Sequence, residues 1–101
     1  MRESVRKFIK LGPLPSNKES PDVIERHELA LQTIQEPVTL EEANALADMF
    51  GPDDCFGLSW TLVHLIESAP GWESLGVIPP GSQPGLQSLR TRIRNAKTMQ
   101  G

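Results

Sequence analysis

The sequence predicts an all-α fold, a compact bundle of four to five short helices that forms a single domain over residues 1–101. Apolar residues recur at intervals of three and four in several segments, which is typical of helices with one buried face. No segment of the sequence shows the sustained alternation of apolar and polar residues that marks a strand. The 8 glycines and 9 prolines supply many turns, as a bundle of short helices requires.

Both ends of the chain are predicted to be basic helices. Residues 2–11 carry apolar residues at helical spacing, and Gly12 followed by Pro13 ends this helix. Residues 84–97 form the second basic helix, with Ser82 as a candidate cap and with leucine and isoleucine on its inward face.

The central helices are predicted to lie within residues 21–68, and two of them are amphipathic. The first covers residues 21–35, because Ser20 can cap it and proline follows at its first position. Its inward face carries His27 among aliphatic residues. The next helix begins at a capping box, in which the Thr39 hydroxyl accepts from the Glu42 amide and the Glu42 carboxylate accepts from the Thr39 amide.

The helix at the centre of the bundle is predicted for residues 53–68. Asp53 or Asp54 caps its start, and leucine, valine and isoleucine cover about half of its circumference. Phe56 and Trp60 widen this apolar surface further. A helix that is apolar on most sides belongs in the middle of a fold.

Residues 69–85 are predicted to form a turn-rich loop between the central helices and the C-terminal helix. Trp72, Val77 and Ile78 are the apolar residues expected to pin this loop to the core.

Charge is segregated along the chain. Residues 13–85 hold all but one of the 13 acidic residues, whereas most of the 10 basic residues lie near the two ends. Either the ends fold back onto the acidic middle, or the acidic middle docks onto a basic protein partner. The second interpretation predicts a non-enzymatic protein-binding module. Its candidate contact residues are Glu25, Glu28, Glu41, Glu42, Asp53, Asp54, Trp72 and Glu73.

Two pairs of residues keep a small enzyme open as an alternative. His64 and Glu67 stand three residues apart on the polar strip of the central helix and can form an acid–base pair. Cys55 could be activated by His27 from another helix, although two adjacent aspartates oppose formation of the thiolate. A surface ion pair for His64, and burial for His27 and Cys55, explain these residues more simply.

We expect no metal or cofactor site. His27 and Glu28 match only the first half of the HExxH zinc motif, because leucine stands where the second histidine is required. Cys55 and His64 fall on opposite sides of a continuous helix. Helix capping accounts for the four acids considered as a magnesium site: Asp53, Asp54, Glu41 and Glu42.

The remaining sequence features indicate a cytoplasmic protein. A single cysteine cannot form an intramolecular disulfide, and no apolar run is long enough to span a bilayer, so we expect no membrane partner. The basic ends offer a third alternative, a nucleic-acid accessory protein. We disfavour nucleic acid as a partner because the C-terminal arginines form no single stripe and have no aromatic residues beside them.

The stretch TLEEANALADMFGPDDCFGLSWTLVHLIESAP resembles one unit of a HEAT-type helical repeat, in which an antiparallel helix pair packs around a turn containing aspartate. This resemblance implies an αα-hairpin over residues 39–70. In size and acidity the chain is also similar to small bacterial immunity proteins, which neutralise a toxin by covering it. That similarity implies a protein partner and an inhibitory role, and neither resemblance assigns site residues.

Overall fold

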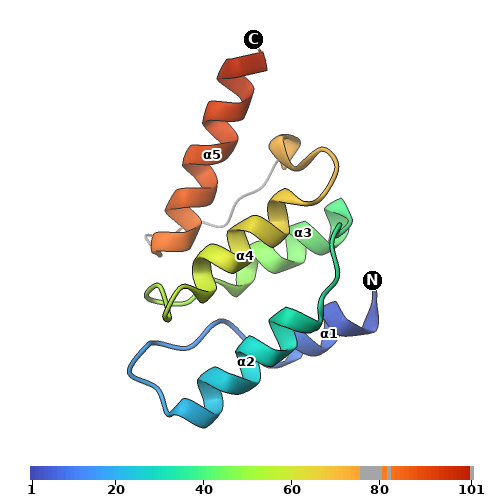
Figure 1. Cartoon of the computed structure of the whole chain (residues 1–101). Coiled ribbons are helices and arrows are strands. Elements are labelled where there is room, and N and C mark those ends of the chain that lie inside the picture. Colours follow the sequence, from blue (N-terminus) through green and yellow to red (C-terminus); the bar gives the residue numbers. More distant parts are fainter. Residues whose placement is uncertain (76–80, 82, 101) are drawn as a thin grey trace.

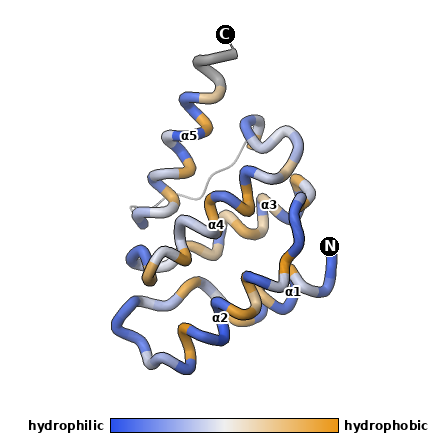
Figure 2. Tube along the Cα trace, viewed as in Figure 1, coloured by the Kyte–Doolittle hydropathy of each residue, from blue (hydrophilic) through white to orange (hydrophobic). Residues whose placement is uncertain are grey.

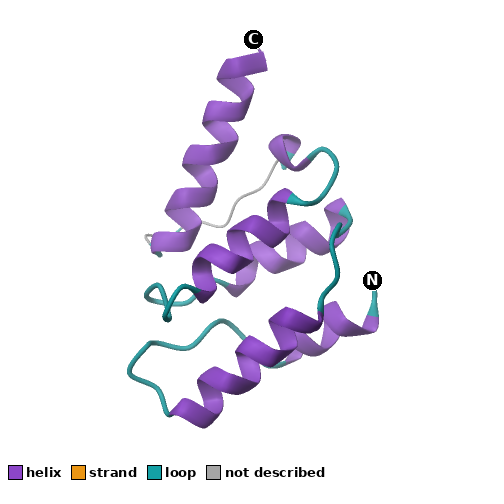
Figure 3. Cartoon of the chain, in the orientation of Figure 1, coloured by secondary structure: helices purple, strands orange, loops and turns teal. Residues whose placement is uncertain are grey.

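The computed structural model describes residues 1–75, 81 and 83–100 of the chain, with side chains up to Ala96. In this part of the chain it is all-α, as predicted, and contains no strand (Figure 3). The α-helices are α1 (Glu3–Lys10), α2 (Pro21–Thr33), α3 (Leu40–Leu46), α4 (Leu58–Glu67) and α5 (Pro84–Gln100). Two short 3-10 helices, η1 (Ala47–Met49) and η2 (Trp72–Ser74), follow α3 and α4.

The helices are arranged in successive layers (Figure 1). Helix α1 packs against α2 and α3, α3 packs against α4, and α5 packs against α4 and η2. Helix α4 therefore lies between α3 and α5 in the interior of the fold. The far end of α5 projects beyond the other helices, and the molecule measures 45 × 28 × 18 Å.

One hydrophobic core runs through all the layers. Hydrophobic residues recur among hydrophilic ones along each helix, so that every helix has a side suited to burial (Figure 2). The largest apolar side chains with almost no exposed surface are Phe8, Leu14, Leu46, Leu62, Ile66, Leu86 and Leu89. Gly85 permits the close approach of α5, because a Cβ at this position would lie closer to Cδ1 of the Phe50 ring than van der Waals contact allows.

Several local predictions are confirmed. The Thr39 hydroxyl accepts from the Glu42 amide at 3.1 Å, and the Glu42 carboxylate accepts from the Thr39 amide at 2.9 Å. Gly12 ends α1 with a φ of 89°, in the left-handed region that glycine adopts readily. Trp72 packs against the core as expected, but Val77, Ile78 and Ser82 lie outside the described residues.

Other predictions are wrong in detail. Ser20 stands at the N-cap of α2, but its side chain makes no capping hydrogen bond in the described structure. The central helix begins at Leu58 and not at residue 53, because residues 53–57 form a turn with left-handed backbone at Cys55, Phe56 and Gly57. Phe56 and Trp60 do not extend the buried surface.

Candidate functional site

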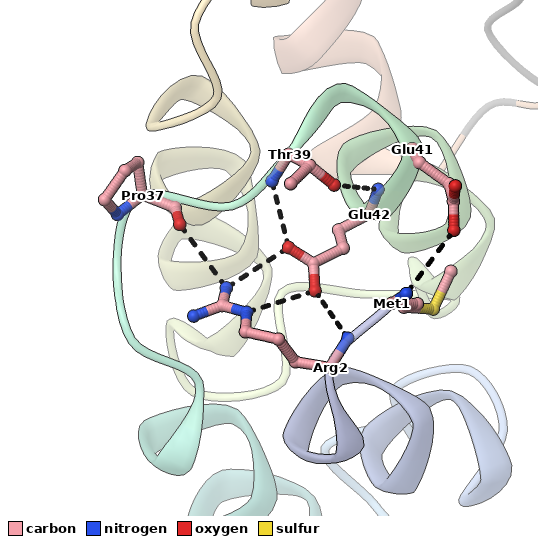
Figure 4. A pocket seen from close by; sticks show the side chains of 6 residues that line it. All are labelled: Met1, Arg2, Pro37, Thr39, Glu41 and Glu42. Atoms are coloured by element: carbon pink, nitrogen blue, oxygen red, sulfur yellow. Dashed lines mark hydrogen bonds and ion pairs between the residues drawn. The ribbon is translucent and has the colours of Figure 1, made fainter.

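A polar recess between the N-terminus and α3 is lined by Met1, Arg2, Pro37, Thr39, Glu41 and Glu42 (Figure 4). At its centre the Glu42 carboxylate accepts from the amide and Nε of Arg2, both at 3.1 Å, and from Nη2 of Arg2 at 3.2 Å. It also accepts from the Thr39 amide, so its oxygens are fully occupied by the chain itself. Glu42 has only 1% of its surface exposed.

These contacts shift the protonation of Glu42. Burial by itself raises the pKa of the carboxyl group, but the hydrogen bonds from Arg2 and Thr39 and the charge of Arg2 outweigh it. The pKa is therefore lowered from 4.5 to about 2. Glu42 remains ionised and connects the N-terminal segment to α3 through Arg2. This structural ion pair accounts for the charged groups at the centre of the recess.

A second cluster lies where α4 meets α5. The Arg92 guanidinium lies 5.3 Å from the centroid of the Trp60 ring, and the His64 ring meets Trp60 edge to face at 4.9 Å. Arg92 also donates to both carboxylate oxygens of Glu67, through Nε and, at 2.9 Å, through Nη2. Trp60 remains 47% exposed.

In this cluster Glu67, one member of the acid–base pair considered from the sequence, pairs with Arg92. No hydrogen bond or ion pair joins Glu67 to His64 within the described part of the chain. The cluster also explains one of the C-terminal arginines, because Arg92 pairs with an acid from another helix, as the sequence suggested. Arg90 donates to the Gly81 carbonyl at 2.7 Å.

The other candidate pair, Cys55 and His27, is buried. The Nδ1 atom of His27 lies 2.9 Å from the Val23 carbonyl, and its ring packs edge to face on Phe8. The Nε2 atom of His27 is buried without a hydrogen-bond partner among the described residues. The pKa of the Cys55 thiol is raised, first by burial and then by the charges of nearby acids. A raised pKa keeps the thiol protonated and opposes nucleophilic chemistry.

Across residues 1–75, 81 and 83–96, no three histidine, cysteine or acidic side chains gather as metal ligands would. In the acidic turn, Asp53 is held by hydrogen bonds from the chain itself. Its carboxylate accepts from the Ser16 hydroxyl at 2.9 Å and from the amides of Asn17 and Cys55. Partial burial raises its pKa, but these hydrogen bonds and the charge of Lys18 prevail and lower it.

The turn held by Asp53 presents an aromatic side chain to solvent. Asp54 completes it by accepting from the Gly57 amide at 2.9 Å. Cys55 and Phe56 adopt φ angles of 48° and 54°, which cost free energy for residues other than glycine. Cys55 consequently points into the core, whereas Phe56 is 74% exposed.

Phe56 forms one wall of an open recess against α2. The other lining residues come from α2 and from the loop before it: Asn17, Glu19, Pro21, Ile24, Glu25 and Glu28. Residues 21, 24, 25 and 28 recur at helical spacing and share one face of α2. Ile24 packs partly against the core, and the glutamates are exposed.

Of the residues predicted to bind a partner, some are exposed around Phe56, and the others contact the chain itself or are partly buried. Exposed acids lie beside Phe56: Glu25, Glu28 and Asp54. Glu42 and Asp53 are occupied by the chain itself, and Glu41 is exposed but lies 3.7 Å from the Met1 amino group. Trp72 and Glu73 are half-buried in η2.

Sequence reasoning missed Phe56 as an exposed aromatic residue. The available signal was its position in DDCFG, where two aspartates and a following glycine are typical of a turn and not of a continuous helix.

No helix in the described residues is long and apolar enough to cross a membrane. No protein-family model, curated protein or solved structure matches the chain.

Proposed function

We propose that the chain is a non-enzymatic protein-binding module that recognises a basic protein through the acidic surface around Phe56. The observation that supports this most strongly is Phe56 itself, a phenylalanine with 74% of its surface exposed on left-handed backbone. Strained backbone is concentrated at functional sites, and exposed aromatic side chains often anchor protein interfaces.

The charges around Phe56 support a basic partner. Glu19, Glu25 and Glu28 line the same recess, and Asp54 is exposed in the adjoining turn. An acidic surface of this kind accelerates association with a basic protein and makes the complex sensitive to salt. The finer form of the proposal is an inhibitor or immunity-type protein that covers the working surface of its partner.

Affinity capture from the cells that produce the protein tests this function. The wild-type chain should enrich a basic protein at low salt, and Glu25→Lys/Glu28→Lys should lose it. Glu36→Lys is the matched control, because Glu36 is exposed beyond the opposite end of α2. Equal capture of the same proteins by the double variant and the control would refute the proposal.

If the captured protein is a toxin or an enzyme, the wild-type chain should suppress its activity at stoichiometric concentration. The double variant should restore that activity. Full activity of the partner in a saturated complex would reject the inhibitory form of the proposal while leaving binding intact.

A further inference from the structure

The recess beside Phe56 combines apolar walls with an acidic rim. Its volume is about 370 Å³, at the small end of the range for binding sites. Pro21, Ile24 and the Phe56 ring provide the apolar surface. The rim carries three exposed glutamates: Glu19, Glu25 and Glu28.

No basic residue lines this recess among the residues that the structure describes. Burial raises the pKa of Asp53, and the charge of the nearby Lys18 helps to lower it. The ion pairs found in the described part of the chain involve other acids: Glu41, Glu42 and Glu67. The carboxylates of Glu25 and Glu28 therefore face solvent beside an apolar surface.

We propose that this recess receives a single lysine or arginine side chain from an extended basic segment of the partner. The aliphatic stem of that side chain lies on Ile24 and Phe56, and its cationic head reaches the carboxylates of Glu25 and Glu28. This inference rests on the proposed function, because it specifies which chemical group the same surface recognises.

A long cationic side chain fits both parts of the recess. Lysine and arginine bury their methylene stems on apolar surface while the charged head stays near water and anions. A cation close to the face of a phenylalanine ring is attracted by the ring electrons as well. A wholly apolar side chain would cover Ile24 but would also remove water from carboxylates without replacing its hydrogen bonds.

The test uses the full chain, labelled with ¹⁵N, and three nonapeptides of glycine and serine that carry three substituted positions. The first peptide has lysine at these positions. The second has norleucine, which keeps a four-carbon stem and removes the charge. The third has diaminopropionate, which removes most of the stem and keeps the charge at the pH of about 5.5 used for all three peptides, where the glutamates are still ionised. Amide shifts are followed at low ionic strength, where charge attraction is strongest.

The lysine peptide should shift the amides of Asn17, Ile24, Glu28 and Phe56 together. The other two peptides should bind at least about tenfold more weakly, which corresponds to about 1.4 kcal/mol. Glu25→Gln/Glu28→Gln and Phe56→Asn should each weaken the lysine peptide about fivefold to tenfold. The control Glu36→Gln should change its affinity less than twofold.

Equal binding of the lysine and diaminopropionate peptides would overturn the inference, because charge alone would then suffice. Shifts confined to another surface, or no shifts at all, would overturn it as well. The proposed function fails separately, through the capture experiment with Glu25→Lys/Glu28→Lys, and it stands if a captured basic protein depends on these acids while no peptide enters the recess.

Discussion

The backbone at Phe56 makes a quantitative prediction about stability. An L-residue in the left-handed region costs roughly 1–2 kcal/mol, and asparagine tolerates this region better than phenylalanine does. Phe56 is 74% exposed, so burial of the rest of its surface stabilises the fold by only about 0.5 kcal/mol, compared with ~2 kcal/mol for full burial. Phe56→Asn should therefore raise the free energy of unfolding by about 0.5–1 kcal/mol.

Phe56→Ala is the matched variant for this measurement. Alanine removes the ring but retains the left-handed penalty, so it should lower the free energy of unfolding by about 0.5 kcal/mol. The difference between the two variants isolates the backbone contribution.

Urea unfolding followed by circular dichroism measures both variants. For a slope of about 1–1.5 kcal/mol per molar urea, the midpoint of Phe56→Asn should rise by about 0.5 M. A loss of more than about 1 kcal/mol in Phe56→Asn would refute the reasoning, since the ring would then be a structural residue.

Substitutions at three further positions test the packing that positions the site. Glu42→Gln should lower the free energy of unfolding by about 2 kcal/mol at pH 7. The lowered pKa of Glu42 corresponds to roughly 3 kcal/mol, and solvent screening reduces this value because the Arg2 side chain is 43% exposed. Because the pKa is about 2 in the folded chain and 4.5 normally, this contribution is complete above pH 4.5 and disappears toward pH 2, so urea unfolding of wild type and variant should converge there. His27→Leu should leave the thermal midpoint unchanged or higher, because it removes a buried nitrogen without a partner in the described structure, whereas His27→Ala should lower it by opening a cavity. Gly85→Ala should cost about 1–3 kcal/mol in urea unfolding, because the new methyl group collides with Phe50 and displaces α5. The role of the Glu42 ion pair would be contradicted if Glu42→Gln still lowered the free energy of unfolding at pH 2. The account of His27 would be contradicted if His27→Leu clearly lowered the thermal midpoint. The close contact at Gly85 would be contradicted if Gly85→Ala had the urea midpoint of the wild type.

The parts of the fold that the sequence predicted well are determined by neighbouring residues. The capping box needs only Thr39 and Glu42, three residues apart, and the end of α1 needs only Gly12. The helices themselves follow from the spacing of apolar residues along each segment.

The start of α4 was harder to predict, because aspartates serve equally well as helix caps and as the polar residues of a turn. In the structure Asp53 and Asp54 hold a turn, and the helix begins only after Gly57. The DDCFG segment carries the signal of a turn, but no sequence rule places a cysteine and a phenylalanine in left-handed backbone, so the direction of the Phe56 side chain was not predicted.

The side-chain pairs that join distant segments could not be predicted from the sequence either. Glu42 meets Arg2 across 40 residues, and Glu67 meets Arg92 across 25. Their charges were visible, but their pairing depends on how the helices dock. Helices α3 and α4 do pack against each other, as an αα-hairpin over residues 39–70 requires. Their kinship with a HEAT-type unit stays a prediction.

The most direct measurement is photo-crosslinking inside the cells that produce the protein, with benzoylphenylalanine in place of Phe56. The matched control carries the same group in place of Trp60, the exposed aromatic residue beside Arg92. If the surface around Phe56 binds a basic partner, residue 56 should form an adduct with one protein at a lysine- or arginine-rich segment, and residue 60 should not. Adducts to that protein from residue 60 but none from residue 56 would contradict the proposed interface.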